Sequence, residues 1–422
     1  MANLYFSLVY LFVVAAMLPL SLSMVADNSY KGRGKRDKRD PPTRSPTRVP
    51  NNNPTMISLD YSYSMTKPCL MLRSNRETGR TASWWCQLTG EDAKNAGAKK
   101  GHSARVKIEG LQNSPASKWK SGITKLFSKD VRIQGKLLLI PQSANVKFDT
   151  QSGDVNSQVD TVDTTKRTIV VRVKATQSET TSSIDELRSG IFGDENDKYN
   201  FKTQMECCSY NSVMIEKANG TNINDGVVEI DVETTDNEIT DYSKMEDICV
   251  SALETLFNTD DLRTVADLIM ICQPPKVDFT YFSAYAYFNS PLSFYWDAYC
   301  TLPDLDMHEV GHNFGLGHAS QQGSTYGDRS GIMGDSIYLD EGEETLRCYN
   351  AAKNWQLGWF EENSINLDLV SNDWEGRLVG PANFQASNDA NKNVLLKIAE
   401  SYYIQFNYAA GFNAGSQEFI NR

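Results

Sequence analysis

The sequence predicts an α+β protein in which a small β-rich domain precedes a larger domain that mixes strands and helices. The chain of 422 residues is longer than one compact domain usually requires, so two folded units are expected. Residues 55–165 contain short runs of alternating polar and apolar residues between turn-forming residues, which is typical of β-strands. In residues 166–422, β-branched runs alternate with amphipathic segments, which indicates strands and helices in succession.

Two segments are expected to lie outside these folded domains. Residues 1–26 are apolar and uncharged, which predicts a secretory signal peptide that is cut after Ser23 or Ala26. No basic residue precedes this apolar run, so an uncleaved signal anchor is the alternative. Residues 27–54 are basic and rich in proline, which predicts a disordered linker. Its dibasic pairs are either protease sites or part of a solvated charged spacer.

The β-rich domain contains two clear strand-like runs, Ser103–Ile108 and Val131–Ile140. Residues 149–165 are polar and rich in aspartate, which predicts a connector to the second domain. His102 is flanked by lysines and glycine, so it is expected to lie in a solvated loop without a functional role.

The second domain shows its elements most clearly before residue 304. An apolar stripe makes residues 240–257 the clearest amphipathic helix, and Ser243 with Glu246 predicts its capping box. Pro291 cannot donate to a strand ladder, so the segment after it is expected at a sheet edge. Pro303 then opens a helix. The other expected elements are strands at 168–173, 226–232, 268–272 and 284–288, and a helix at 183–192.

Three of the four histidines fall in one short window that reads H-E-x-x-H-x-x-G-x-x-H. On a helix, His308 and His312 lie one turn apart on the same face. Gly315 allows the helix to end sharply, because glycine tolerates positive φ, and the chain then returns with His318 as a third ligand. Three protein ligands and one open position are typical of a catalytic zinc site. Glu309 has no ligand task at this spacing and is predicted to be the general base.

Such a site predicts hydrolysis of a peptide bond by an activated water, with Glu309 passing the proton to the leaving amine. Two other interpretations remain: solvated histidines on a surface helix, or a binding or adhesion protein that keeps the metal without catalysis. Copper or another divalent ion is an alternative to zinc (Zn2+).

The acidic run at 340–344 offers ligands of the type that Ca2+ prefers, or is simply solvated. The net charge of −11 argues against non-specific nucleic-acid binding.

The segment from Tyr326 to Gly334 resembles the Met-turn of the metzincin clan. Met333 matches its methionine, which the resemblance places beneath the metal as a hydrophobic floor. Further segments make the chain similar, over residues 167–410, to the gametolysin family. These are Cys208–Asn211, Ala284–Cys300, His308–Asn313, Tyr326–Asp328 and Tyr349–Trp359.

The resemblance implies a metzincin-like domain with a twisted mixed sheet, two main helices above a cleft and a loop-rich lower part. It also implies a secreted metallopeptidase that acts on extracellular matrix or cell-wall glycoproteins, with the β-rich domain as a propeptide. A membrane-anchored, sheddase-like protease is the alternative if residues 1–26 are retained. Asp328 is expected either to orient a ligand histidine or to serve its own turn.

The chain departs from the clan pattern in two places. Asp335 stands where several metzincins have a tyrosine that binds the intermediate, and Tyr338 lies three positions further on. The cysteine switch of matrixins is absent, so Cys69 or Cys86 either caps the zinc or forms a disulfide with the other.

The remaining sequence features favour secretion. Eight cysteines suit an oxidising compartment, although their pairing is not readable from the sequence. Asn219 begins an N-x-T acceptor for glycosylation, a modification of secreted proteins.

Overall fold

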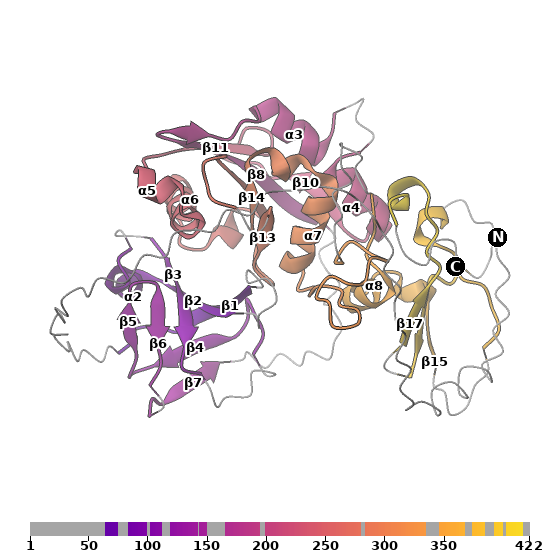
Figure 1. Ribbon diagram of the computed structural model, residues 1–422, viewed down its shortest axis with the longest axis horizontal. Helices are drawn as coiled ribbons and strands as arrows, with labels where there is room; N and C mark the ends of the chain where they lie inside the picture. Colours follow the sequence, from indigo (N-terminus) through magenta and orange to yellow (C-terminus); the bar gives the residue numbers. More distant parts are fainter. Residues whose placement is uncertain are drawn as a thin grey trace, which may run out of the picture. The chain divides into compact units, whose positions relative to one another are not determined.

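A computed structural model gives the structure of the chain and confirms a mixed α+β protein (Figure 1). The predicted signal peptide, the basic linker, most of the connector, the acidic run at 340–344, Asp335 and Tyr338 lie outside the described residues. The structure describes residues 64–74, 83–98, 102–111, 119–141, 143–149, 165–194, 199–279, 283–334, 346–367, 374–384, 392–399 and 402–416.

The N-terminal sheet, as we call strands β1 to β7, has the order β5-β6-β3-β2-β1-β4-β7. A disulfide between Cys69 and Cys86 joins its two central strands, so the disulfide interpretation of this pair is confirmed. The predicted strand at 131–140 is instead a hairpin, because Gly135 adopts a φ of 57° that permits a tight turn. The strands are β1 (Cys69–Ser74), β2 (Ser83–Leu88), β3 (Ala104–Glu109), β4 (Lys125–Ser128), β5 (Arg132–Gln134), β6 (Leu137–Leu139) and β7 (Val146–Asp149).

The central sheet, as we call strands β8 to β14, is followed by the histidine motif, which comes after its last strand, β14. Its main path is β10-β8-β12-β14-β13, with β9 and β11 also paired to β8. Every residue of β12 is buried, as expected for a continuous apolar run inside a largely parallel sheet. The strands are β8 (Thr165–Ala175), β9 (Ser178–Glu179), β10 (Met214–Lys217), β11 (Val227–Val232), β12 (Leu268–Gln273), β13 (Ala284–Ala286) and β14 (Leu292–Trp296).

Strand β14 corrects the prediction that Pro291 places the next segment at an edge. It lies between β12 and β13, and β13 is the antiparallel edge strand. Pro291 precedes the strand, so its missing N–H removes no ladder bond, and its carbonyl accepts from the amide of Ile269.

Helices α6 and α7 pack on this sheet, and Figure 1 shows α7 next to β13 and β14. The predicted capping box of α6 is wrong: Asp241 caps the helix through the amides of Ser243 and Lys244. Ser183 and Glu186 form a capping box at α3. Within the described residues, the α-helices are α2 (Gly90–Asn95), α3 (Ile184–Phe192), α4 (Phe201–Ser209), α5 (Asp236–Ile239), α6 (Tyr242–Phe257), α7 (Pro303–Asn313) and α8 (Ala351–Leu357).

The region after α7 contains more regular structure than the loop-rich part that was expected. Helix α8 is followed by a three-stranded sheet of β15 (Ser364–Leu367), β16 (Leu395–Ile398) and β17 (Tyr402–Gln405). A disulfide between Cys208 of α4 and Cys348 ties this region to the central domain. Within the described residues, no helix is long and apolar enough to span a bilayer.

The N-terminal sheet contacts α6 through a buried polar network. Arg105 of β3 pairs with Glu246 at 3.1 Å, and their side chains are only 3% and 2% exposed. The hydroxyls of Tyr285 and Tyr287 donate to the same carboxylate. His102 lies in a loop as predicted, but it is only partly exposed, and its Nε2 lies 2.5 Å from the hydroxyl of Thr255.

Candidate metal centre

The three motif histidines converge on one point. His308 and His312 lie one turn apart on α7, and His318 follows the helix in a segment outside any helix or strand. One ring nitrogen from each histidine lies within 4.8 Å of the others. The Nε2 atoms of His312 and His318 are 3.0 Å apart. Three imidazole nitrogens in this arrangement fit a single transition-metal ion.

The end of α7 brings the third histidine into place. The helix closes with the amide of Gly315 donating to the carbonyl of His312, and the amide of Leu316 donating to that of Gly311. Gly315 has a φ of +86°, as the predicted sharp exit requires. A Cβ at this position would lie 2.5 Å from Oδ1 of Asn289, so the end of that side chain would also have to move.

Backbone carbonyls orient two of the three rings. Nδ1 of His308 lies 2.8 Å from the carbonyl oxygen of Ile332, and Nδ1 of His312 lies 2.7 Å from that of Leu316. Because a carbonyl only accepts, each Nδ1 must carry the hydrogen, and each Nε2 keeps its lone pair for a cation. The protonation pattern therefore suits metal ligands.

The electrostatics of the site also keep the ligands neutral. Burial, followed by the neighbouring His308 and His318, holds the pKa of His312 well below its usual range. Burial, followed by His308 and Lys353, lowers the pKa of His318 to about 3. Neutral imidazole is the form that binds a metal, so a cation does not compete with protons near neutral pH.

Glu309 lies beside the ligands in a dry environment. It is 4% exposed, and burial raises the pKa of its carboxyl to about 8. Among the described residues, its Oε2 accepts no hydrogen bond. A buried, unsatisfied carboxylate is costly unless a charge or donor compensates it, and an adjacent cation with its water would supply both.

Met333 packs against Gly311 of the motif helix. It is fully buried, and a Cβ on Gly311 would lie 2.5 Å from its sulfur, so methionine and helix pack without a gap. Its carbonyl accepts from the amide of Ala319, directly after the third histidine. The segment that carries Met333 thus contacts the ligand set twice. The carbonyl of Ile332 binds the ring of His308, and the carbonyl of Met333 binds the backbone next to His318.

Two aromatic residues at the site were not identified from the sequence. The ring of Phe288 lies 5.0 Å from that of His312, and the ring of Tyr326 lies 4.0 Å from that of His318. Phe288 ends the edge-strand segment and Tyr326 begins the Met-turn segment. Both segments were noted for the family resemblance, but no spacing rule singles out these side chains.

Asp328 and Asn219 do not join the histidines. Oδ1 of Asp328 accepts from the amide and hydroxyl of Ser330, and Oδ2 accepts from Asn350, so this residue serves its turn. Asn219 is exposed on the loop after β10.

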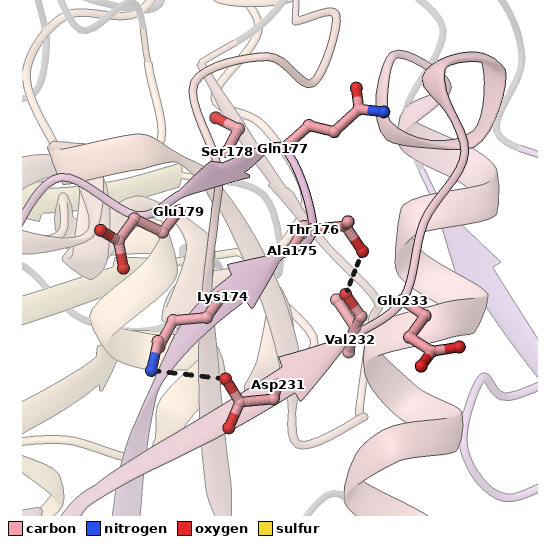
Figure 2. Close-up of a pocket in the computed structure, with 9 residues that line it drawn as sticks. All are labelled: Lys174, Ala175, Thr176, Gln177, Ser178, Glu179, Asp231, Val232 and Glu233. Carbon is pink, nitrogen blue, oxygen red and sulfur yellow. Dashed lines mark hydrogen bonds and ion pairs between the residues drawn. The ribbon is translucent and has the colours of Figure 1, made fainter.

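A pocket of about 680 Å³ lies at the ends of β8, β9 and β11, and none of the site residues lines it (Figure 2). It contains the ion pair of Lys174 and Asp231 at 3.3 Å, and the threonine hydroxyl of Thr176 points to the carbonyl of Val232. The pocket is open and charged, and it offers no chemistry related to the histidine cluster.

Comparison with known proteins agrees with this site. Residues 168–412, more than half of the chain, match the family described as gametolysin peptidase M11. The chain is 42% identical over 53 residues to the protein named autolysin from Chlamydomonas reinhardtii, a match that spans 13% of this chain and 8% of that protein. No solved structure matches the chain. The match over the whole histidine-bearing domain shows that the chain belongs to the gametolysin peptidase M11 family.

Proposed function

We propose that the chain is a zinc-dependent endopeptidase in which His308, His312 and His318 hold the ion and Glu309 is the general base. One observation carries the proposal: three imidazoles converge within 4.8 Å beside a buried carboxylate that has an unsatisfied oxygen. Zinc suits three neutral nitrogens with an open position, and copper is the main competitor for the same ligands. Family membership independently supports a peptidase.

The residues of the chain support each proton movement of such a reaction. A bound zinc ion lowers the pKa of a bound water to about 7 and polarises the scissile carbonyl. Glu309 would accept the proton of the attacking water and donate it to the leaving amine. The carbonyls that fix His308 and His312 keep the ligands oriented while the charge develops.

The test compares Glu309→Gln with the wild-type chain. We expect proteolysis of a denatured protein to fall by about 10²- to 10⁴-fold, because general acid–base catalysis is lost. Zinc content, measured by elemental analysis, should stay at the wild-type level, and 1,10-phenanthroline should abolish the wild-type activity. Glu216→Gln, at an exposed position on β10, is the matched control. Unchanged proteolysis by Glu309→Gln would reject the mechanism, whereas a wild-type chain that binds zinc without proteolysis would favour a binding or adhesion protein.

We further propose that the enzyme is secreted and acts on extracellular matrix or cell-wall glycoproteins. Disulfides at Cys69–Cys86, Cys208–Cys348 and Cys272–Cys300 support an oxidising compartment. The exposure of Asn219 makes it accessible for glycosylation. N-terminal sequencing of the mature protein separates secretion from membrane anchoring, because a start at or beyond Met24 excludes a retained anchor.

We also propose that residues 55–165 form a propeptide that restrains the site. Its supporting contacts involve Phe288, the residue whose ring packs on His312. The amide of Phe288 donates to the carbonyl of Arg73, and its carbonyl accepts from the hydroxyl of Ser121. The guanidinium of Arg73 also lies 5.4 Å from the centre of the Phe288 ring. These contacts follow the edge strand β13, where an extended substrate would add to the sheet.

The propeptide proposal is tested by placing a recognition sequence for a specific protease in residues 150–164 of the full-length chain. Cleavage should increase the hydrolysis of a short fluorogenic peptide, because the N-terminal sheet can then leave the site. The uncut protein, and the wild-type chain treated with the same protease, are the controls. If cleavage and separation leave the activity unchanged, the N-terminal sheet does not restrain the site, and the propeptide proposal is rejected.

A further inference from the structure

The three histidines are not held equally. His308 and His312 lie on α7, and a backbone carbonyl fixes each ring through Nδ1. His318 lies outside any helix or strand and is more exposed than the other two. In the part of the chain that the structure describes, no carbonyl contacts Nδ1 of His318, whose only hydrogen-bonding contact is Nε2 to His312. Another group must therefore set the orientation of this ring.

Tyr326 is the group that packs on it. Its ring centre lies 4.0 Å from that of His318, with 38° between the planes. The same tyrosine ring lies 6.1 Å from His308, with 28° between the planes. Aromatic rings at these separations attract one another beyond simple burial, and their mutual geometry restricts rotation about the side-chain bonds. Tyr326 thus contacts both the first and the third of the three histidines, His308 and His318.

The loop that carries Tyr326 is itself restrained. Gln321 and Ser324 exchange two backbone hydrogen bonds, and the amide of Gly327 donates to the carbonyl of Ser324. The amide of Asp328 donates to the carbonyl of Ala319, the residue directly after His318. These hydrogen bonds attach the loop to the residue next to His318, and so they fix the position of Tyr326 relative to His318.

We propose that Tyr326 is a positioning residue for the third metal ligand: its ring takes the place of the carbonyl that His308 and His312 each have. The role rests on the proposed function, because it presupposes a metal ion at the histidines. Orienting a ligand before the ion arrives reduces the ordering required on binding, and loss of such a partner typically costs about 10- to 100-fold in metal affinity. The aromatic ring, rather than the hydroxyl, carries this role.

The test measures zinc affinity by competition with a chromogenic chelator in three full-length variants. Tyr326→Phe keeps the ring and should bind zinc as the wild type does. Tyr326→Leu keeps apolar bulk without the ring and should bind about 10- to 100-fold more weakly. Tyr402→Leu, at a tyrosine that is 65% exposed on β17, is the matched control and should leave the affinity unchanged.

Thermal unfolding of the zinc-free proteins separates positioning from loop packing. The proposal expects the zinc-free Tyr326→Leu variant to unfold close to the wild-type temperature. A loss of stability that accounts for the lost affinity, or a Tyr326→Phe variant as weak as Tyr326→Leu, would overturn the role of the ring. Equal zinc affinity in wild type and Tyr326→Leu would overturn the inference alone, whereas a wild-type chain that binds no zinc would reject the proposed function as well.

Discussion

Gly315 meets two separate requirements at the exit of the motif helix. Its φ of +86° is unfavourable for any residue with a Cβ, and a Cβ would also lie 2.5 Å from Oδ1 of Asn289. The backbone of Asn289 is anchored, because its backbone N–H donates to the carbonyl of His312. The backbone turn therefore requires glycine, whereas a Cβ would also force the end of the Asn289 side chain to move, and Gly315 lies three residues before His318.

We expect Gly315→Ala to lower the free energy of unfolding by at least about 1–2 kcal/mol, the cost of a left-handed conformation for an L-residue. Zinc affinity should fall as well, because relief of the contact with Asn289 moves the segment that carries His318. Chemical denaturation of the zinc-free protein and chelator competition measure the two effects. Gly317→Ala is the matched control, since its Cβ would meet nothing within 4 Å. Equal effects at the two positions would refute this explanation.

For single residues, the sequence predicted those site positions whose roles depend only on local backbone geometry. His308, His312 and Gly315 follow from helical periodicity and from the conformational freedom of glycine, and the structure brings them together as expected. Tyr326 and Phe288 were missed because a ring contact depends on where a loop folds. The capping prediction for Glu246 failed because Arg105 and two tyrosine hydroxyls, distant in sequence, bind its carboxylate instead.

Helix α7 is held near its C-terminal end and near its middle by other elements of the fold. Near its end, Nδ2 of Asn313 donates to the carbonyls of Tyr287 and Leu292, which fixes the helix to the β13–β14 connection. Near its middle, the hydroxyl of Tyr349 donates to the carbonyl of Met307. The segment containing Tyr349 is in turn attached to α4 through the disulfide of Cys348. The rigidity of the ligand helix therefore depends on covalent closure far along the chain.

We expect the double variant Cys208→Ser, Cys348→Ser to lose about 2–5 kcal/mol of stability, because this disulfide restricts a long loop of the unfolded chain. The two cysteines are 140 positions apart in sequence. Denaturation in the absence of reductant measures the loss. Cys207→Ser provides the control on the same helix, since Cys207 is an exposed free cysteine. A comparable loss in the control would assign the effect to α4 rather than to the disulfide.

Elements with strong local periodicity were predicted well, and their partners were not. The buried run 268–272 and the helix at 183–192 appear as β12 and α3 with nearly the expected bounds. The place of β14 inside the sheet was wrong, because strand order depends on pairing between distant segments. The sheet of β15, β16 and β17 was also missed, because its short strands pair across distant segments.

For the molecule as a whole, the contact between the N-terminal sheet and α6 determines how the proposed propeptide is held. Besides the buried pair of Arg105 and Glu246, Lys136 binds Asp247 at 2.6 Å. The amide of Ser103 donates to Glu254 at 2.9 Å, and its hydroxyl donates to the same carboxylate. The sequence could not predict this interface, because the paired residues are distant in sequence and no local pattern distinguishes them from other polar residues.

Glu254 makes this interface sensitive to pH. Burial raises the pKa of its carboxyl above the usual 4.5, against the opposing effects of the Ser103 hydrogen bonds and of Arg105. Because the folded-state pKa exceeds the unfolded one, the folded protein keeps this proton longer as the pH rises. The associated stability is complete below about pH 4.5 and is lost as the pH increases through the raised pKa.

The variant Glu254→Gln removes this titration while its amide can still bind Ser103. We therefore expect its unfolding midpoint, relative to that of the wild type, to rise steadily from pH 4.5 toward neutral pH. Urea denaturation across this range measures the difference, and Glu361→Gln, at an exposed position, controls for the loss of one negative charge. A difference between variant and wild type that stays constant with pH would show that Glu254 does not titrate in this window. A difference that grows toward acid would show that the interface stabilises its ionised form.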